Sequence, residues 1–149
     1  MMEMTDKKEL NSEKIQFISN GIRKQNLMKM YNATAGKIAE GYVEVEIPRQ
    51  EALIRGAGFF YGGVVAAAVD TAAYFSAATL YESDAYFVTV ELKVNYLNPA
   101  YGEILHTMGE VIKSGKTLVI CKCECYVIND GEKSHVATSL VTLMKVKQK

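Results

Sequence analysis

The chain lacks an excess of either charge: its 149 residues include 17 Lys or Arg and 17 Asp or Glu, for a formal net charge of zero. Without a global positive field, it has no general means of collecting a polyanion, so nucleic acid is not expected as its main partner. Proteins close to neutrality also tend to associate, which favours a homo-oligomer.

Cysteine is scarce. Cys121, Cys123 and Cys125 form no disulfide framework of the kind found in secreted domains. The polar N-terminus has no apolar segment of signal-peptide length, so we expect a cytoplasmic protein. The three thiols share one face of a strand and are expected to be small core hydrophobes. His106 and His135 are each solitary, so we expect neither a metal site nor a redox cofactor.

Residues 56–81 contain almost no charge: Asp70 is the only Asp, Glu, Lys or Arg among them. The length would suffice for a membrane span. However, a mid-span Asp costs roughly 2.5 to 3.5 kcal/mol on insertion scales, and the many Ala, Gly, Ser and Thr residues offset little of it. The better interpretation is a helix that is buried on all sides inside a globular protein. Other elements of the chain must then surround this helix.

Alternating apolar residues predict the strands that surround this helix. In residues 86–96 the even positions, from Tyr86 to Tyr96, are expected to form one buried face. Turn residues separate further strands. The five strands expected are residues 41–47, 86–97, 103–113, 116–128 and 134–146.

A helix is expected before the first strand, capped by Asn11 or Ser12 and reaching about Met30, although Gly21 weakens it. Residues 1–10 are expected to be a disordered tail, and residues 11–149 a single domain because no linker or repeat divides them. The class is therefore α+β, with an antiparallel sheet of about five strands curled around one central helix.

Three sequence blocks carry a family resemblance. Residues 61–72 read YGGVVAAAVDTA, residues 88–100 read VTVELKVNYLNPA, and residues 113–117 read KSGKT. In this order they resemble the hotdog-fold acyl-CoA thioesterases, in particular the phenylacetic-acid-degradation (PaaI-like) group, over roughly residues 30–146. The resemblance implies a hotdog fold, hydrolysis of an acyl-CoA to a carboxylic acid and free CoA, and a homodimer that can double into a homotetramer.

Gly62, Gly63 and Asp70 offer the chemistry that thioester hydrolysis needs. Free N–H groups at the start of a helix can stabilise a developing oxyanion, and a carboxylate in apolar surroundings is a stronger base than one in water. Along one helix, however, Gly62 and Asp70 are separated by roughly 12 Å, which is too far for one thioester carbonyl to touch both. Two antiparallel copies of the helix would bring Gly62 of one subunit beside Asp70 of the other.

The resemblance implies the same composite site, with Asp70 acting as base or nucleophile and Thr89 helping to orient the water. Tyr61 and Arg55 stand where many members have His and Asn. Arg55 could stabilise an oxyanion or neutralise Asp70 by pairing with it.

Coenzyme A, as part of substrate and product, is the expected small-molecule partner. Lys113 and Lys116 of the predicted hairpin are candidates for contacting its phosphates. Together with Gly63, Tyr61 and Arg55, they form the expected substrate-binding set.

Two other functions fit the same fold. A non-catalytic hotdog protein could bind an acyl-CoA or lipid as a sensor or carrier, and release of free thiol from acyl-CoAs would distinguish it from a thioesterase. A hotdog dehydratase or hydratase is disfavoured, because neither His106 nor His135 lies on the predicted central helix.

Overall fold

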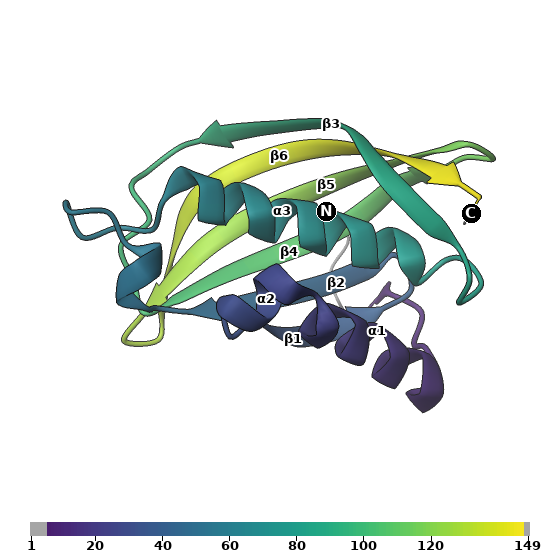
Figure 1. Ribbon diagram of the computed structural model, residues 1–149, viewed down its shortest axis with the longest axis horizontal. Helices are drawn as coiled ribbons and strands as arrows, with labels where there is room; N and C mark the ends of the chain where they lie inside the picture. Colours follow the sequence, from purple (N-terminus) through teal and green to yellow (C-terminus); the bar gives the residue numbers. More distant parts are fainter. Residues whose placement is uncertain (1–5, 148–149) are drawn as a thin grey trace.

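The computed structural model describes residues 6–147 as a curved antiparallel sheet wrapped around one central helix (Figure 1). The six strands run in the order β1-β2-β4-β5-β6-β3. The helices are α1 (Ser12–Lys24), α2 (Asn26–Met30) and the central α3 (Gly62–Ala78), with a short 3-10 turn η2 (Glu51–Leu53). The strands are β1 (Thr34–Ala39), β2 (Tyr42–Pro48), β3 (Tyr86–Tyr96), β4 (Ile104–Ser114), β5 (Leu118–Asn129) and β6 (Glu132–Val146). The expected α+β architecture is confirmed.

The N-terminal helix is shorter than expected. Asn11 caps α1 by accepting the Lys14 N–H at 2.8 Å, but the helix ends at Lys24, and Gln25 adopts an extended conformation before α2 begins. Gly21 has a packing role, because a Cβ atom there would lie 2.7 Å from the Phe75 ring of α3. The residue that weakens the helix therefore lets α1 cross close to α3.

The sheet covers one side of α3 with small and apolar side chains. Gly109 on β4 permits this closeness, because a Cβ atom there would lie 2.7 Å from the Ala72 carbonyl oxygen. Cys121, Cys123 and Cys125 are fully buried free thiols, so the prediction that they are core residues is confirmed. Burial raises the pKa of Cys121 to about 12 and that of Cys125 to about 11.

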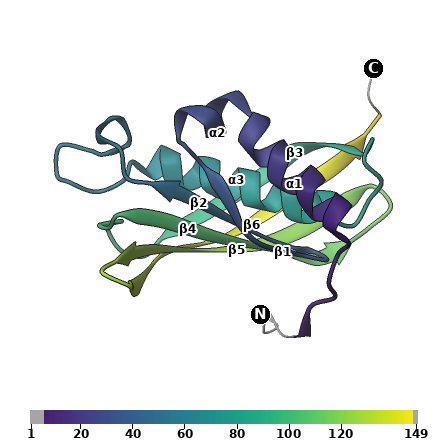
Figure 2. The same cartoon turned by 90° about the horizontal axis from the view of Figure 1, so that it is seen from below.

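The expectation that α3 is buried on all sides is wrong for a single chain. A stripe of half-buried or exposed residues runs along the helix at intervals of three and four, through Gly63, Ala67, Asp70 and Tyr74. Such spacing places them on one helix face. All the helices lie on one side of the sheet, so the opposite side of α3 has no second sheet over it (Figure 2). Within residues 6–147, no helix combines the length and apolar character needed to cross a membrane.

The expectation that the even residues of β3 form one buried face is also wrong. The β3–β6 register shifts between Thr89 and Glu91, and a bulge of this kind moves the following side chains to the other face. Phe87 is buried before the shift, whereas Val88 and Val90 are 36% and 51% exposed. As the last strand of the sheet, β3 has one edge without a partner strand in the described part of the chain.

Two segments were not anticipated by the sequence analysis. It missed β1, which pairs with β2. Residues 1–5 of the expected tail lie outside the described residues, but residues just after them contact the sheet. Lys7 forms an ion pair with Glu110, and the Lys8 carbonyl accepts the Glu40 N–H at 3.0 Å.

Candidate active site

Asp70 and Thr89 meet where α3 passes β3. The Thr89 hydroxyl donates a hydrogen bond of 2.6 Å to Asp70 Oδ1, although the two residues are 19 positions apart. Asp70 is half-buried and opens into a small cavity of about 180 Å³. This cavity is also lined by Gln25, Thr71, Tyr74, Phe75 and Tyr86. The structure therefore brings together the acid and the hydroxyl that the sequence singled out, beside an accessible space.

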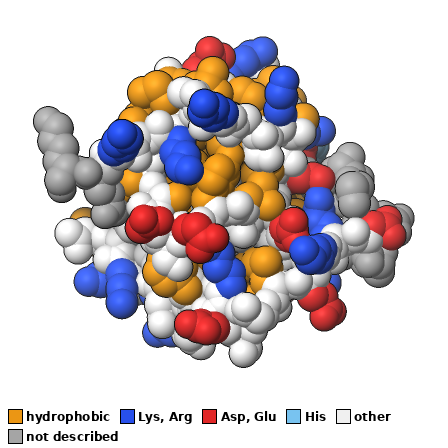
Figure 3. Space-filling model, turned by 90° about the vertical axis from the view of Figure 1, so that its right-hand side faces the viewer, with side chains coloured by type: hydrophobic (Ala, Val, Ile, Leu, Met, Phe, Trp, Pro, Cys, Tyr) orange, Lys and Arg blue, Asp and Glu red, His pale blue; other side chains and the backbone are white. Residues whose placement is uncertain are grey.

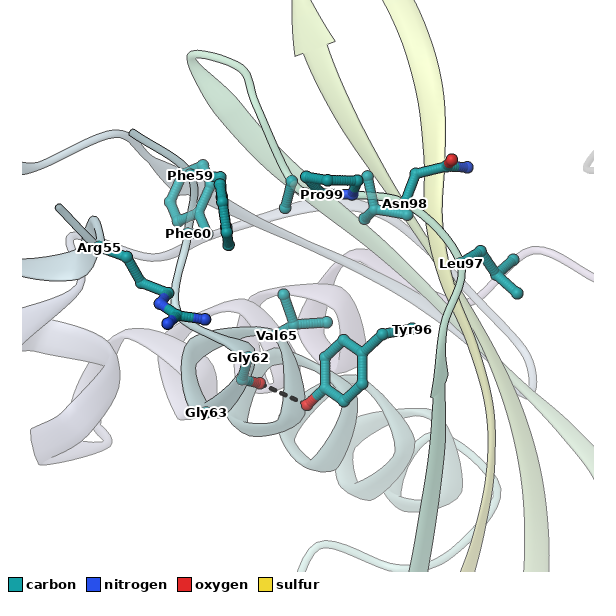
Figure 4. A pocket seen from close by; sticks show the side chains of 12 residues that line it. Arg55, Phe59, Phe60, Gly62, Gly63, Val65, Tyr96, Leu97, Asn98 and Pro99 are labelled. Atoms are coloured by element: carbon teal, nitrogen blue, oxygen red, sulfur yellow. Dashed lines mark hydrogen bonds between the residues drawn. The ribbon is translucent and has the colours of Figure 1, made fainter. Parts of the chain in front are cut away.

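Gly62 and Gly63 lie at the start of α3, about two turns before Asp70. They border a larger cavity of about 520 Å³ (Figure 4). The helix begins at Gly62, so the N–H groups of both glycines have no acceptor four residues earlier within the helix. A Cβ atom at Gly63 would meet nothing within 4 Å, which leaves that backbone open to a ligand. The arrangement provides N–H donors next to a space large enough for a small molecule.

Tyr96 is a residue of this cavity that the sequence analysis did not assign to the site. Its hydroxyl donates a 2.6 Å hydrogen bond to the Gly62 carbonyl, as Figure 4 shows, and thereby ties the end of β3 to the start of α3. Burial raises the pKa of Tyr96, which keeps its hydroxyl protonated as a donor. The sequence analysis expected Tyr96 on the inner face of its strand but gave it no role, because no pattern in the sequence shows that its hydroxyl reaches the Gly62 carbonyl.

The expected substrate-binding residues divide between different places. Arg55 lines the cavity with Gly62 and Gly63, and its guanidinium lies 5.4 Å from the centre of the Phe59 ring. The Tyr61 side chain instead is half-exposed and lines a neighbouring apolar groove formed mainly by α2 and η2. The salt bridges of the described residues do not pair Arg55 with Asp70.

Lys113 and Lys116 lie far from Gly62, near the end of the molecule where α3 ends. Their hairpin is joined to the segment after α3 by a 3.0 Å hydrogen bond from the Tyr81 hydroxyl to the Gly115 carbonyl. Figure 3 shows this end of the molecule, where basic side chains border an apolar patch. One chain therefore does not bring these lysines to the cavity beside Gly62.

The outer face of the sheet carries a separate polar cluster. Glu44 is buried, accepts a 2.7 Å hydrogen bond from the Tyr42 hydroxyl, and lies 3.3 Å from the His106 ring. Burial alone would raise the pKa of Glu44, but the hydrogen-bond donors around it lower it to about 2. Among residues 6–147, no group of three or more His, Cys, Asp or Glu side chains could hold a metal ion.

Comparison with known proteins shows the family of the chain. Residues 57–134 match the model of the thioesterase superfamily. The chain is 35% identical to a solved thioesterase family protein from Silicibacter pomeroyi, with a TM-score of 0.86 over 91% of this chain and 99% of that one. It is 31% identical over 121 residues to a candidate esterase of Saccharolobus solfataricus, covering 81% of this chain and 78% of that protein.

The fold and the matches define a hotdog-fold thioester hydrolase. The chain belongs to the thioesterase superfamily. The PaaI protein of the Escherichia coli phenylacetic acid degradation operon has the same fold, with a TM-score of 0.80 at 16% identity over 95% of this chain and 99% of that one.

Proposed function

We propose that the protein is an acyl-CoA thioesterase in which Asp70 activates water. The carboxylate takes a proton from the water as its oxygen attacks the thioester carbon. The carbonyl oxygen then carries negative charge, which the free Gly62 N–H stabilises. Collapse of the intermediate breaks the carbon–sulfur bond, and the proton held by Asp70 passes to the departing sulfur. A carboxylic acid and free CoA then leave, and Asp70 is again ionised. This reaction requires neither a metal nor a redox cofactor.

The observation that carries this proposal is the 2.6 Å hydrogen bond from Thr89 to Asp70 on the half-exposed face of α3. An Asp within an Ala-rich helix, open to a cavity and fixed in direction by one hydroxyl, retains acceptor capacity for a water molecule. A purely structural carboxylate would be enclosed by several donors, as Glu44 is. We therefore assign Asp70 as the base and Thr89 as the residue that orients it.

The proposed site is composite. Gly62 and Asp70 are roughly 12 Å apart along α3, and they line different cavities. The open face of α3 and the unpaired edge of β3 allow two chains to pair through a two-fold axis with their α3 helices antiparallel. Each site would combine Gly62 of one chain with Asp70 of the other, in a homodimer that can double into a homotetramer.

The same pairing would supply cations for coenzyme A. The hairpin that carries Lys113 and Lys116 lies near the C-terminal end of α3. Antiparallel helices would bring this end of one chain toward the Gly62 cavity of the other. The hairpin lysines then become candidates for binding the CoA phosphates.

Asp70→Asn tests the chemistry, because it keeps the shape of the side chain but removes the base. We expect the rate of thiol release from acyl-CoAs to fall by at least about 100-fold, the lower range for a general base. The melting temperature should be unchanged or higher, because a half-buried carboxylate with few donors is not stabilising.

Asp84→Asn is the matched control, because Asp84 is exposed in the loop between α3 and β3. It should retain wild-type activity. Full activity in Asp70→Asn would contradict the mechanism. Tight acyl-CoA binding by the wild type with no release of thiol would favour a carrier instead.

A further inference from the structure

The cavity beside Gly62 combines apolar walls with one cation. Its apolar lining consists of Phe59, Phe60, Val65, Leu97, Pro99, Ala100 and Val136. Among the described residues that line it, Arg55 alone has a formally charged side chain. A buried hydrocarbon segment and a single anionic group would together match this lining.

The backbone of Arg55 is held in a tight turn, although the residue is exposed. Its N–H donates to the Phe59 carbonyl at 2.9 Å, and its carbonyl accepts the Gly58 N–H at 2.8 Å, which closes a tight turn. Gly58 has a φ of +96°, a conformation that glycine tolerates. The Tyr101 hydroxyl fixes the same loop through a 2.6 Å hydrogen bond to the Ala57 carbonyl. The guanidinium thus stacks on Phe59 from a fixed backbone.

The positive charge at this place is not neutralised by the rest of the described chain. Within residues 6–147, no carboxylate oxygen lies within 4.0 Å of the Arg55 guanidinium. The first turn of α3 contains no acidic residue, so the positive end of the helix dipole faces the same cavity without compensation. In Figure 4 the Arg55 side chain extends toward the start of α3. The start of α3 serves the thioester oxyanion in the proposed function, so the unpaired guanidinium is the feature available to a second anion.

We propose that Arg55 binds a carboxylate carried by the acyl group of the substrate, so that the enzyme prefers acyl thioesters that end in a second carboxylate. This inference rests on the proposed thioesterase function. A guanidinium matches a carboxylate through two parallel hydrogen bonds, and the apolar walls accommodate the hydrocarbon chain between the carboxylate and the thioester. The phosphates of CoA are a second possible source of the anion, but the hairpin lysines are available for them.

The test compares acyl-CoAs of equal chain length, such as hexanoyl-CoA, which ends in a methyl group, and adipoyl-CoA, which ends in a carboxylate. In the wild type we expect adipoyl-CoA to have the higher kcat/KM. In Arg55→Gln this preference should fall by about tenfold, as expected for the loss of one hydrogen-bonded charge pair. The loss should appear mainly in KM, and Arg55→Lys should restore part of it. Arg23→Gln, which removes an exposed cation from α1, should leave the preference unchanged.

Other results would overturn the proposal. An equal fall in kcat for both substrates would instead assign Arg55 to the oxyanion. A defect of Arg55→Gln seen with CoA thioesters, but not with N-acetylcysteamine thioesters of the same acids, would assign it to the CoA phosphates. An unchanged preference would show that Arg55 does not contact the substrate.

Binding of the free acids separates this proposal from the proposed function. By calorimetry, wild-type protein should bind adipate more tightly than hexanoate, and Arg55→Gln should lose the difference. If the protein hydrolyses no acyl-CoA but shows this difference, the thioesterase function fails and the carboxylate site stands. If it hydrolyses acyl-CoAs without any difference between the acids, the carboxylate site fails alone.

Discussion

Asp70 and Glu44 have opposite surroundings. The contrast distinguishes a carboxylate suited to catalysis from one suited to stabilising the fold. Asp70 receives a hydrogen bond from Thr89 and opens into a cavity. Glu44 is enclosed on the outer face of the sheet, with donors from Tyr42 and the Lys37 N–H. A carboxylate with spare acceptor capacity can bind and activate water, whereas one surrounded by donors stabilises the folded state in its ionised form.

Glu44 should therefore make the stability of the protein depend on pH. Burial would raise its pKa, but the nearby His106 ring, the Tyr42 hydroxyl and the Lys37 N–H together lower it from 4.5 to about 2. Its stabilising effect is complete above the unfolded-state pKa and is lost as the pH falls toward the folded-state value. Between pH 6 and pH 3, we expect the wild type to lose about 2 kcal/mol of unfolding free energy that Glu44→Gln does not lose.

Urea unfolding of both proteins at the two pH values measures this difference. Glu132→Gln, at an exposed position, should follow the wild-type curve. If Glu44→Gln loses as much stability on acidification as the wild type, Glu44 is not the group responsible.

At the scale of elements, β3 determines both the site and the surface around it. It supplies Thr89 to Asp70 in the middle of α3 and Tyr96 to Gly62 at the start of α3. It also exposes Val88 and Val90 at the edge of the sheet. A long edge strand with exposed apolar residues readily pairs with another strand. We therefore expect β3 to pair with its copy in a second chain.

Placing lysines on this edge tests the pairing. In a two-fold pair, the double variant Val88→Lys and Val90→Lys would set like charges close to each other. We expect the apparent mass from light scattering to shift toward the monomer, with at least about a tenfold weaker association. Thiol-releasing activity should fall with the fraction of paired chains.

Leu140→Lys provides the control, because Leu140 is 47% exposed on β6, which has a strand on each side. This variant should keep the mass and activity of the wild type. Dissociation by Leu140→Lys, with no effect of the β3 substitutions, would place the contact on the face of the sheet instead of its edge.

The sequence predicted the elements with strong periodicity and missed those that depend on tertiary contacts. Alternation in residues 103–146 was enough to predict β4, β5 and β6 to within a few residues. The short strand β1 has no clear alternation, and its Gly36 is needed for a contact, because a Cβ atom there would lie 2.7 Å from Glu44 Oε2. The bulge in β3 was not visible in an alternating pattern that continues through it.

The candidate site shows the same division. Asp70 and the glycine pair could be proposed from the residues, because one acid in an apolar helix and two glycines at its start stand out in a sequence. Thr89 was proposed from the family resemblance alone. The role of Tyr96 could not be predicted, because it depends on a hydrogen bond to the carbonyl of Gly62, which lies 34 positions earlier in the sequence. Sequence spacing also could not show that the side chains of Tyr61 and Arg55 line two different cavities.

At the scale of the whole molecule, one chain carries both halves of the proposed site, but they lie at different points along α3. The cavity beside Gly62 and the cavity beside Asp70 share no lining residue. The open face of α3 lies on the side away from the sheet, where a second helix could pack (Figure 2). The central claim is therefore that a working site needs two chains.

Gly62→Pro is a suitable variant for removing the N–H donor of one half-site. Proline is favoured at the first position of a helix. The preceding Tyr61, with φ −57° and ψ 140°, already has the extended conformation that a residue before proline adopts. A Cβ atom at Gly62 would lie 3.3 Å from the Tyr96 ring, so a small shift is needed. Circular dichroism must therefore first show that the variant folds.

The most direct measurement mixes the Asp70→Asn and Gly62→Pro variants, each of which we expect to be inactive alone, under conditions that allow subunits to exchange. Each heterodimer would contain one site with both groups intact and one site with neither. Half of the dimers would be mixed, so we expect the thiol-releasing activity to recover to about a quarter of the wild-type value. If two folded, exchanging variants show no recovery, the site lies within one chain, and the assignment of Gly62 or Asp70 is wrong.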